Sequence, residues 1–139
     1  MSYLLDTNVL SELRRDDKAN PEVLRWAIKH RLEDFCLSAI TILEIELGVL
    51  LLARRDPEQA KFFRAWIEKT LSDFAGRIVP VDTDVALRCA ALHVPNPRPD
   101  RDAYIAATAL VHDLTVVTRK TRDFEGIGVK LFNPWISAS

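Results

Sequence analysis

The sequence has little cysteine: only Cys36 and Cys89 occur in 139 residues, without CxxC spacing. Two isolated cysteines within apolar segments are typical of a reducing cytoplasm and not of a disulfide-stabilised fold. No stretch approaches the ~18–20 uninterrupted apolar residues of a membrane-spanning helix. The segment Met1–Asp6 lacks the basic region and cleavage site of a signal peptide. We therefore expect a cytoplasmic protein with no membrane partner.

An excess of positive charge is also missing, because the formal net charge is −1. Proteins that bind nucleic acid only by neutralising phosphates usually have a basic surface, so a simple DNA- or RNA-binding module is disfavoured. This balance does not argue against a metal-dependent nuclease, in which bound cations meet the phosphate. The sequence has no zinc-type Cys/His spacing, P-loop or GxGxxG motif, and we interpret His30, His93 and His112 as structural or solvated.

What is present indicates one α/β domain over residues 1–139, with 48% hydrophobic residues to form its core. Strand-like runs occur at residues 3–5, 35–37, 78–81, 115–118 and 129–132, and helical patterns separate most of them. This alternation predicts a mostly parallel sheet of four to five strands with helices on both faces. Pro80 indicates that the third strand lies at an edge.

Capping residues mark most of the expected helix starts. After a first short helix from about Val9, helices are expected to begin after Asn20, Ser38, Asp56, Asp82 or Thr83, and Asp100. The helix of residues 39–53 is apolar on nearly every side, which predicts burial on two sides. One side would cover the sheet, and the other would pack against another helix or a second subunit. Homodimerisation is therefore a hypothesis.

Four acidic residues follow strand-like runs or lie early in the next helix: Asp6, Glu44, Asp102 and Asp123. Because the carboxyl ends of parallel strands meet at one edge of a sheet, these residues are expected to gather there. Taken singly, these residues also have structural interpretations. Asp6 fits a helix N-cap, the helix dipole favours an acid such as Asp102 in the first turn, and Asp123 fits a surface turn. Asp82 satisfies the same rule, and we set it aside because its strand is expected at the edge of the sheet, distant from a central crevice.

Glu44 is the hardest of the four to explain structurally, because a carboxylate on an apolar helix is costly unless it is paired or coordinated. Glu46, two residues later, could instead be the solvated one. Clustered carboxylates repel one another, and a hard divalent cation with oxygen ligands relieves that repulsion. Such a site suits phosphodiester hydrolysis, because the metal activates water and neutralises the phosphate. The sequence therefore predicts a Mg²⁺-type site.

The chain also resembles a known family, on motifs spread over almost its whole length. These motifs are Leu5-Asp6-Thr7-Asn8, residues 37–48 from Leu37 through Glu44 to Gly48, residues 102–110, and Val117-Thr118-Arg119 through Asp123-Phe124. In order and spacing they are similar to those of PIN-domain ribonucleases, most closely the VapC- and FitB-type toxins of toxin–antitoxin pairs.

This resemblance implies a three-layer α/β/α sandwich and a Mg²⁺- or Mn²⁺-dependent endoribonuclease that cleaves RNA. It implies that the four acidic residues are the catalytic and metal-binding side chains, with Asn8 and Thr118 as supporting polar groups. It further implies a homodimer and a cognate antitoxin that blocks the acidic pocket. Operator DNA would be bound only through the antitoxin complex.

The chain departs from the family at residue 120, where lysine stands in place of the more common asparagine. Lys120 could contact the scissile phosphate, pair with Asp123 and displace a second metal, or point outward. Two other functions remain as alternatives. A phospho-acceptor signalling module or aspartyl-phosphate phosphatase is also α/β, although Asp6-Thr7-Asn8 fits neither acidic motif. An inactive partner-binding subunit is the other, and the intact acidic set argues against it.

Overall fold

In the computed structural model, residues 2–136 are described, and their strands and helices alternate along the chain. The strands are β1 (Tyr3–Leu5), β2 (Phe35–Ser38), β3 (Ile78–Val79), β4 (Thr115–Val117) and β5 (Lys130–Phe132). The helices are α1 (Thr7–Leu13), α2 (Pro21–Ile28), α3 (Ala39–Arg55), α4 (Pro57–Asp73), α5 (Thr83–Leu92) and α6 (Asp100–His112). Short 3-10 turns η1 (Asp16–Lys18), η2 (Leu32–Asp34) and η3 (Thr121–Phe124) complete them.

The five strands form a parallel sheet in the order β3-β2-β1-β4-β5, which confirms the predicted sheet. The chain builds one side of the sheet outward from β1, and then returns to add β4 and β5 on the other side. The strand order therefore reverses between β1 and β4, and such reversals create a crevice beyond the strand ends. β3 is an edge strand, as Pro80 predicted, although it ends at Val79.

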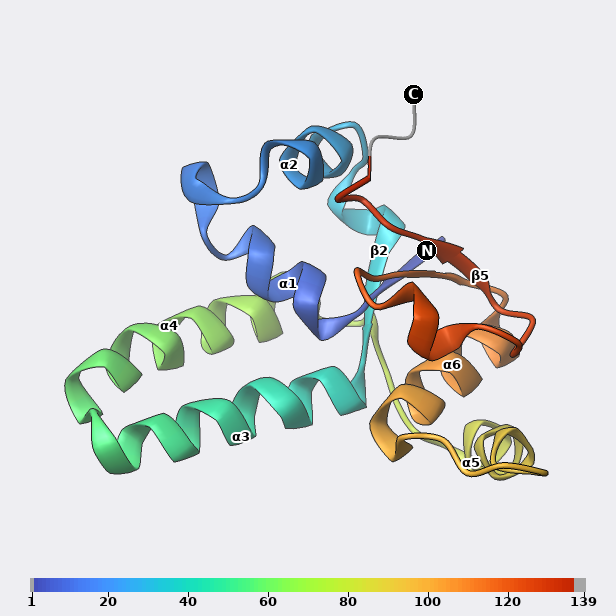
Figure 1. The fold of residues 1–139 in the computed structure, drawn as a ribbon. Coiled ribbons are helices and arrows are strands. Elements are labelled where there is room, and N and C mark those ends of the chain that lie inside the picture. The colour runs from blue at the N-terminus through green and yellow to red at the C-terminus, as the bar shows by residue number, and fades with distance from the viewer. Residues whose placement is uncertain (1, 137–139) are drawn as a thin grey trace.

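Helices cover both faces of the sheet, giving the three-layer α/β/α sandwich (Figure 1). Leu5, Leu37 and Val117 point to one face, where they pack in a core with residues of α1, α3 and α4. Their neighbours Leu4 and Cys36 point to the opposite face and pack against α6. This alternation follows from the two-residue period of a strand, and both faces are apolar because both are covered.

Most helix starts have the predicted caps. The side chains of Asn20, Ser38, Asp56 and Asp82 each accept a hydrogen bond from a backbone N–H in the first turn of the following helix. The prediction for α6 was wrong, because Asp100 is the first helical residue and Pro99 precedes it without a side-chain cap. The start of α1 was also misplaced, since this helix begins at Thr7 and not near Val9.

Helix α3 forms a long hairpin with α4, and the two helices lie side by side (Figure 1). Ile45 and Val49 face the core, but Leu43, Leu47, Leu50 and Leu51 are 37–53% exposed. One side of α3 thus faces the core, as predicted, and the other side is only partly covered by α4 within the single chain, so an apolar stripe stays open to solvent. Coverage of the rest by a second subunit stays a prediction. None of the helices within residues 2–136 combines the length and apolar character that crossing a bilayer requires.

Candidate active site

The candidate site lies beyond the carboxyl ends of β1 and β4, where the strand order reverses, and we call the space between these strand ends and the start of α6 the crevice. The two strands are paired in parallel with Leu5 opposite Val117, so Asp6 and Thr118 leave the sheet side by side. The backbone N–H of Asp6 still donates to the Val117 carbonyl, which continues the pairing by one step (2.9 Å). The side chains then meet directly, since the Thr118 hydroxyl donates to Asp6 Oδ2 at 2.8 Å.

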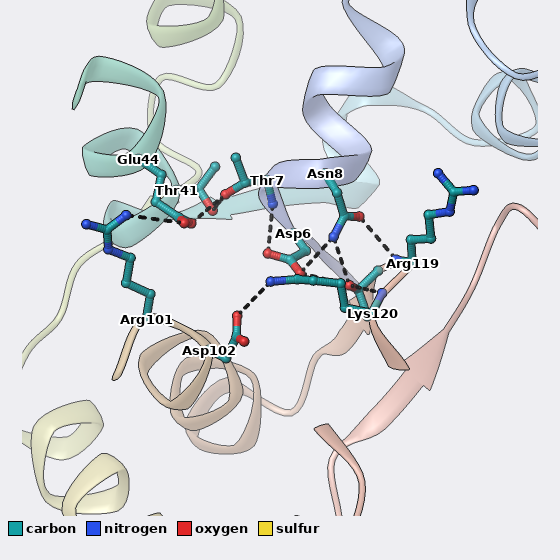
Figure 2. A network of polar contacts seen from close by, with 10 residues as sticks. Asp6, Thr7, Asn8, Thr41, Glu44, Arg101, Asp102, Arg119 and Lys120 are labelled. Carbon is teal, nitrogen blue, oxygen red and sulfur yellow. Dashed lines mark hydrogen bonds and ion pairs between the residues drawn. The ribbon is translucent and has the colours of Figure 1, made fainter. Parts of the chain in front are cut away.

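Asp6 is only 2% exposed, and both of its carboxylate oxygens accept hydrogen bonds (Figure 2). Oδ1 caps α1 by accepting from the Thr7 backbone N–H at 2.8 Å, so the capping interpretation of Asp6 is correct. Oδ2 accepts from Asn8 Nδ2 at 3.2 Å as well as from Thr118. Burial raises the pKa of Asp6 above its ordinary value, although the bonds from Thr118 and Thr7 act in the opposite direction.

The loop that follows β4 is fixed by the same polar groups. Asn8 Oδ1 accepts from the backbone N–H of Arg119 at 3.1 Å, while its Nδ2 also lies 3.2 Å from the Thr118 hydroxyl. The Thr118 hydroxyl oxygen accepts from the backbone N–H of Lys120 at 3.0 Å. The two residues expected to support the acids thus orient Asp6 and also set the path of the chain through residue 120.

Glu44 reaches the crevice from α3. The Thr7 hydroxyl donates to Glu44 Oε1 at 2.7 Å, and its oxygen lies 3.2 Å from the hydroxyl of Thr41. Glu44 Oε2 lies 3.7 Å from the guanidinium of Arg101, at the start of α6. The Glu44 side chain is 25% exposed, so it is a half-buried carboxylate with two partners. Glu46 instead faces α4, where it forms two hydrogen bonds with Arg64.

Asp102 faces Asp6 from the first turn of α6, and an ammonium group lies in the crevice with them (Figure 2). Lys120 Nζ lies 3.2 Å from Asp102 Oδ1, and the two side chains are 47% and 13% exposed respectively. Burial disfavours the charged amine, but the charges of Asp6, Asp102 and Asp123 outweigh it and raise the pKa of Lys120. Lys120 therefore points inward and pairs with Asp102, unlike any arrangement considered from the sequence.

Asp123 has the most peripheral position of the four acids. It lies in η3 and is exposed, and its backbone N–H donates to the Lys120 carbonyl at 3.0 Å. Its carboxylate acts on the Lys120 ammonium through charge and not through a close ion pair. Asp123 is consequently near enough to Lys120 to act on it by charge, but it is more exposed than the other three acids.

As the side chains stand, the acids do not form a closed metal cage. Across residues 2–136, no three acidic, histidine or cysteine side chains are grouped closely enough to hold one metal ion. The crevice still has the chemistry of a cation site, because its donors are carboxylate, hydroxyl and amide oxygens, which hard divalent ions prefer. The ammonium of Lys120 already stands there as a cation between Asp102 and Asp6. The residues present therefore fit a Mg²⁺- or Mn²⁺-type ion.

A match to the PIN-domain family covers residues 3–130. This chain belongs to the PIN-domain family. Over 137 residues it is 43% identical to the toxin FitB of Neisseria gonorrhoeae, covering 95% of this chain and 97% of that protein. It is 38% identical to the VapC ribonuclease Y4jK of Sinorhizobium fredii over 140 residues, covering 95% and 96%. A solved structure of FitAB bound to an IR36 DNA fragment superposes with a TM-score of 0.86, at 40% identity over 99% of this chain and 98% of that one.

Other reactive side chains of this PIN domain lie away from the crevice. Cys36 is fully buried in β2, and burial raises its pKa to about 11, so its thiol is not ionised at neutral pH. Burial likewise raises the pKa of Cys89. His30 packs against the rings of Tyr3 and Trp26, as a structural histidine does.

Sequence reasoning missed three contributors to this PIN-domain site: Thr7, Arg101 as the partner of Glu44, and the inward orientation of Lys120. Thr7 carried a usable signal, because it directly follows Asp6 at the strand end. The other two depend on how α3, α6 and η3 pack around the crevice. A cavity next to Glu44, between α1, α3 and α4, is lined by residues that include Arg14, Gly48, Phe63 and Trp66. This cavity extends the polar crevice with an apolar wall.

Proposed function

We propose that this PIN-domain protein is the toxin of a toxin–antitoxin pair and acts as a Mg²⁺- or Mn²⁺-dependent endoribonuclease. The observation that carries this proposal is the buried Asp6 carboxylate facing Asp102 across the crevice, with a cationic group between them. The similarity to the toxin FitB and to a VapC ribonuclease supports the same function.

Asp6, Glu44, Asp102 and Asp123 are the residues that would hold the ion. When bound, it lowers the pKa of a water molecule and neutralises charge on the scissile phosphate. The chain's own groups prepare the carboxylates for this role. Asn8 and Thr118 fix Asp6 Oδ2, and Thr7 fixes Glu44 Oε1. The phosphatase and phospho-acceptor alternatives stay disfavoured, because Asp6-Thr7-Asn8 matches the acidic motif of neither class.

Two exposed arginines flank the acids and supply positive charge that the overall composition lacks. Arg101 lies half exposed beside Glu44, and Arg119 lies on the other side with its guanidinium turned away from the carboxylates (Figure 2). The exposed Arg119 is anchored by its backbone to Asn8, and its guanidinium stacks over Trp135 at 5.2 Å. We assign these two side chains to the RNA backbone, since arginine suits bidentate contacts to phosphate.

The proposed partners are a cognate antitoxin, a second copy of this chain, and operator DNA bound through the antitoxin complex. The exposed leucines of α3 provide an apolar surface for protein contacts, and the cavity between α1, α3 and α4 leads from this hairpin to Glu44. The similar FitAB assembly is bound to DNA, which supports the third partner. Light scattering at micromolar concentration is expected to give a dimer mass, and a monomer mass would contradict the homodimer.

The direct test is to incubate the purified protein with total RNA and Mg²⁺ or Mn²⁺, with and without excess EDTA, and to map the cut ends. Cleavage is expected with either ion and not in EDTA. Asp102→Asn should abolish cleavage while circular dichroism shows a folded protein. Asp113→Asn is the matched control, because Asp113 also pairs with a lysine, at 3.3 Å, but outside the crevice. Undiminished cleavage in EDTA, or full activity of Asp102→Asn, would overturn the proposal.

The toxin role has its own test in cells. Induced expression of the wild-type chain is expected to arrest growth, and Asp102→Asn is expected to relieve the arrest at equal protein levels. Harmless expression of an active nuclease would contradict the toxin role while leaving the ribonuclease activity in place.

A further inference from the structure

Lys120 is held in the crevice at both ends, by its backbone and by its ammonium group. Its backbone N–H is bound to the Thr118 hydroxyl, and the residue before it is bound to Asn8. These bonds fix the backbone of Lys120 next to Thr118 and Asn8. From there the side chain passes below the Asp6 carboxylate and ends at Asp102 (Figure 2). The groups that orient Asp6 therefore also aim the ammonium of Lys120.

A second lysine–aspartate pair shows what is unusual about this one. Lys130 Nζ lies 3.3 Å from Asp113 Oδ1, almost the distance between Lys120 and Asp102. The Asp113 side chain is 86% exposed and its charge is solvated, whereas the Asp102 side chain is 13% exposed. A largely buried carboxylate depends on its partner much more than a solvated one does.

We propose that Lys120 is the resident counter-ion of the crevice, whose ammonium neutralises the facing carboxylates in the metal-free protein and leaves Asp102 when a divalent cation binds. The proposal rests on the proposed function, because it concerns the ion of that nuclease. It adds that cation binding is an exchange reaction, in which one positive group is replaced by another.

This exchange has two physical consequences. The ammonium and the incoming ion compete for the same carboxylate, and like charges repel, so Lys120 weakens divalent-cation binding. In the absence of the ion, the same ammonium relieves the repulsion between Asp102 and Asp6, so Lys120 stabilises the metal-free fold. Removing only the charge at residue 120 should therefore raise the affinity for the divalent cation and lower the stability of the metal-free protein.

The test is calorimetric titration of the full chain with Mn²⁺ in the absence of RNA, for the wild type, Lys120→Met, Lys120→Arg and Lys130→Met. Lys120→Met is expected to bind Mn²⁺ on the order of tenfold more tightly, the scale of a lost half-buried ion pair. Lys120→Arg retains the charge and should stay near the wild type. Lys130→Met removes an equivalent charge outside the crevice and should also match the wild type.

Thermal melting in EDTA supplies the second readout. Lys120→Met should melt at a lower temperature than the wild type and should gain more on addition of Mn²⁺, whereas Lys130→Met should show neither change. Equal or weaker Mn²⁺ binding by Lys120→Met overturns the proposal. If Lys120→Met binds Mn²⁺ no more tightly than the wild type and also cleaves RNA more weakly at saturating Mn²⁺, the role of Lys120 is to contact the phosphate.

The wild-type RNA assay separates this inference from the function on which it rests. An active, EDTA-sensitive nuclease whose Mn²⁺ affinity is insensitive to residue 120 overturns the counter-ion role alone. If neither the wild type nor Lys120→Met binds Mn²⁺, the counter-ion role and the metal-dependent nuclease both fail.

Discussion

The inner and outer ends of the crevice are held in different ways. At the inner end, Asp6 and Thr118 directly follow β1 and β4, and Asn8 lies in the first turn of α1. Asp6 is 2% exposed, and its carboxylate bonds only to groups of these segments. At the outer end, Glu44 and Arg101 come from α3 and α6, and their side chains are 25% and 50% exposed at a separation of 3.7 Å.

The two ends therefore differ in how rigidly the fold positions their side chains. Strand pairing sets the inner end, so its oxygens are positioned before any ligand arrives, which is the condition for a preorganised site. The outer end depends on long side chains that can move with little effect on the fold. Lys120 connects the two ends, because its backbone is fixed at the inner end and its ammonium reaches Asp102.

The largest effect on stability and RNA cleavage should come from a change at the inner end, Thr118→Val, which keeps the shape of the side chain and removes the hydroxyl. Asp6 then loses a donor in a buried place, which should cost about 1–3 kcal/mol of unfolding free energy. If Asp6 binds the metal as proposed, loss of a group that orients it should also reduce RNA cleavage ~10–100-fold. Urea unfolding and a cleavage assay measure the two effects.

Thr70→Val is the matched control for this change. Thr70 is also buried, but its hydroxyl donates to the Trp66 carbonyl within α4 and not to a group of the crevice. Cleavage by Thr70→Val should equal that of the wild type. If both variants lost activity equally, the inner end would have no special role.

A smaller effect is expected from Thr7→Val at the junction between the two ends. Glu44 loses the hydroxyl that donates at 2.7 Å, while the Thr7 backbone N–H still binds Asp6. Cleavage should fall by about tenfold, at the low end of the range for such orienting groups. The free energy of unfolding should change little, because Glu44 is partly solvated. A loss of activity larger than that of Thr118→Val would reverse the proposed ranking of the two ends.

The smallest effect should come from Arg101→Met. The pair with Glu44 is long and half exposed, so its loss should change the free energy of unfolding by less than about 0.5 kcal/mol. Affinity for Mn²⁺ should change less than it does in Lys120→Met, because the guanidinium lies beside Glu44 and not between the facing acids. Calorimetry on both variants compares their Mn²⁺ affinities. An equal change in Arg101→Met and Lys120→Met would contradict a special role of Lys120 as the counter-ion.

Much of this arrangement follows from the sequence, because it depends on local rules. The strand ends at Asp6 and Thr118, the caps at Asn20 and Ser38, and the edge strand before Pro80 are set by short-range patterns, and they were predictable. Glu44 was noticed because a carboxylate on an apolar helix needs a partner.

Other features depend on packing between distant elements and were not predictable. The inward path of Lys120 depends on the loop bonds to Thr118 and Asn8, and a long side chain has many alternative rotamers. The open leucine stripe of α3 could not be predicted, because apolar composition alone does not reveal how much of this helix α4 covers. The exposed position of Asp123 depends on the turn η3, which periodicity does not specify.

The central claim is that a divalent cation binds between Asp6 and Asp102 and displaces the ammonium of Lys120. Anomalous diffraction from crystals of the protein grown with Mn²⁺ tests it most directly. An anomalous peak is expected within bonding distance of carboxylate oxygens of both aspartates, with Lys120 Nζ moved away from Asp102. A crevice without a peak at saturating Mn²⁺, or a peak with the Lys120–Asp102 pair intact, would contradict it.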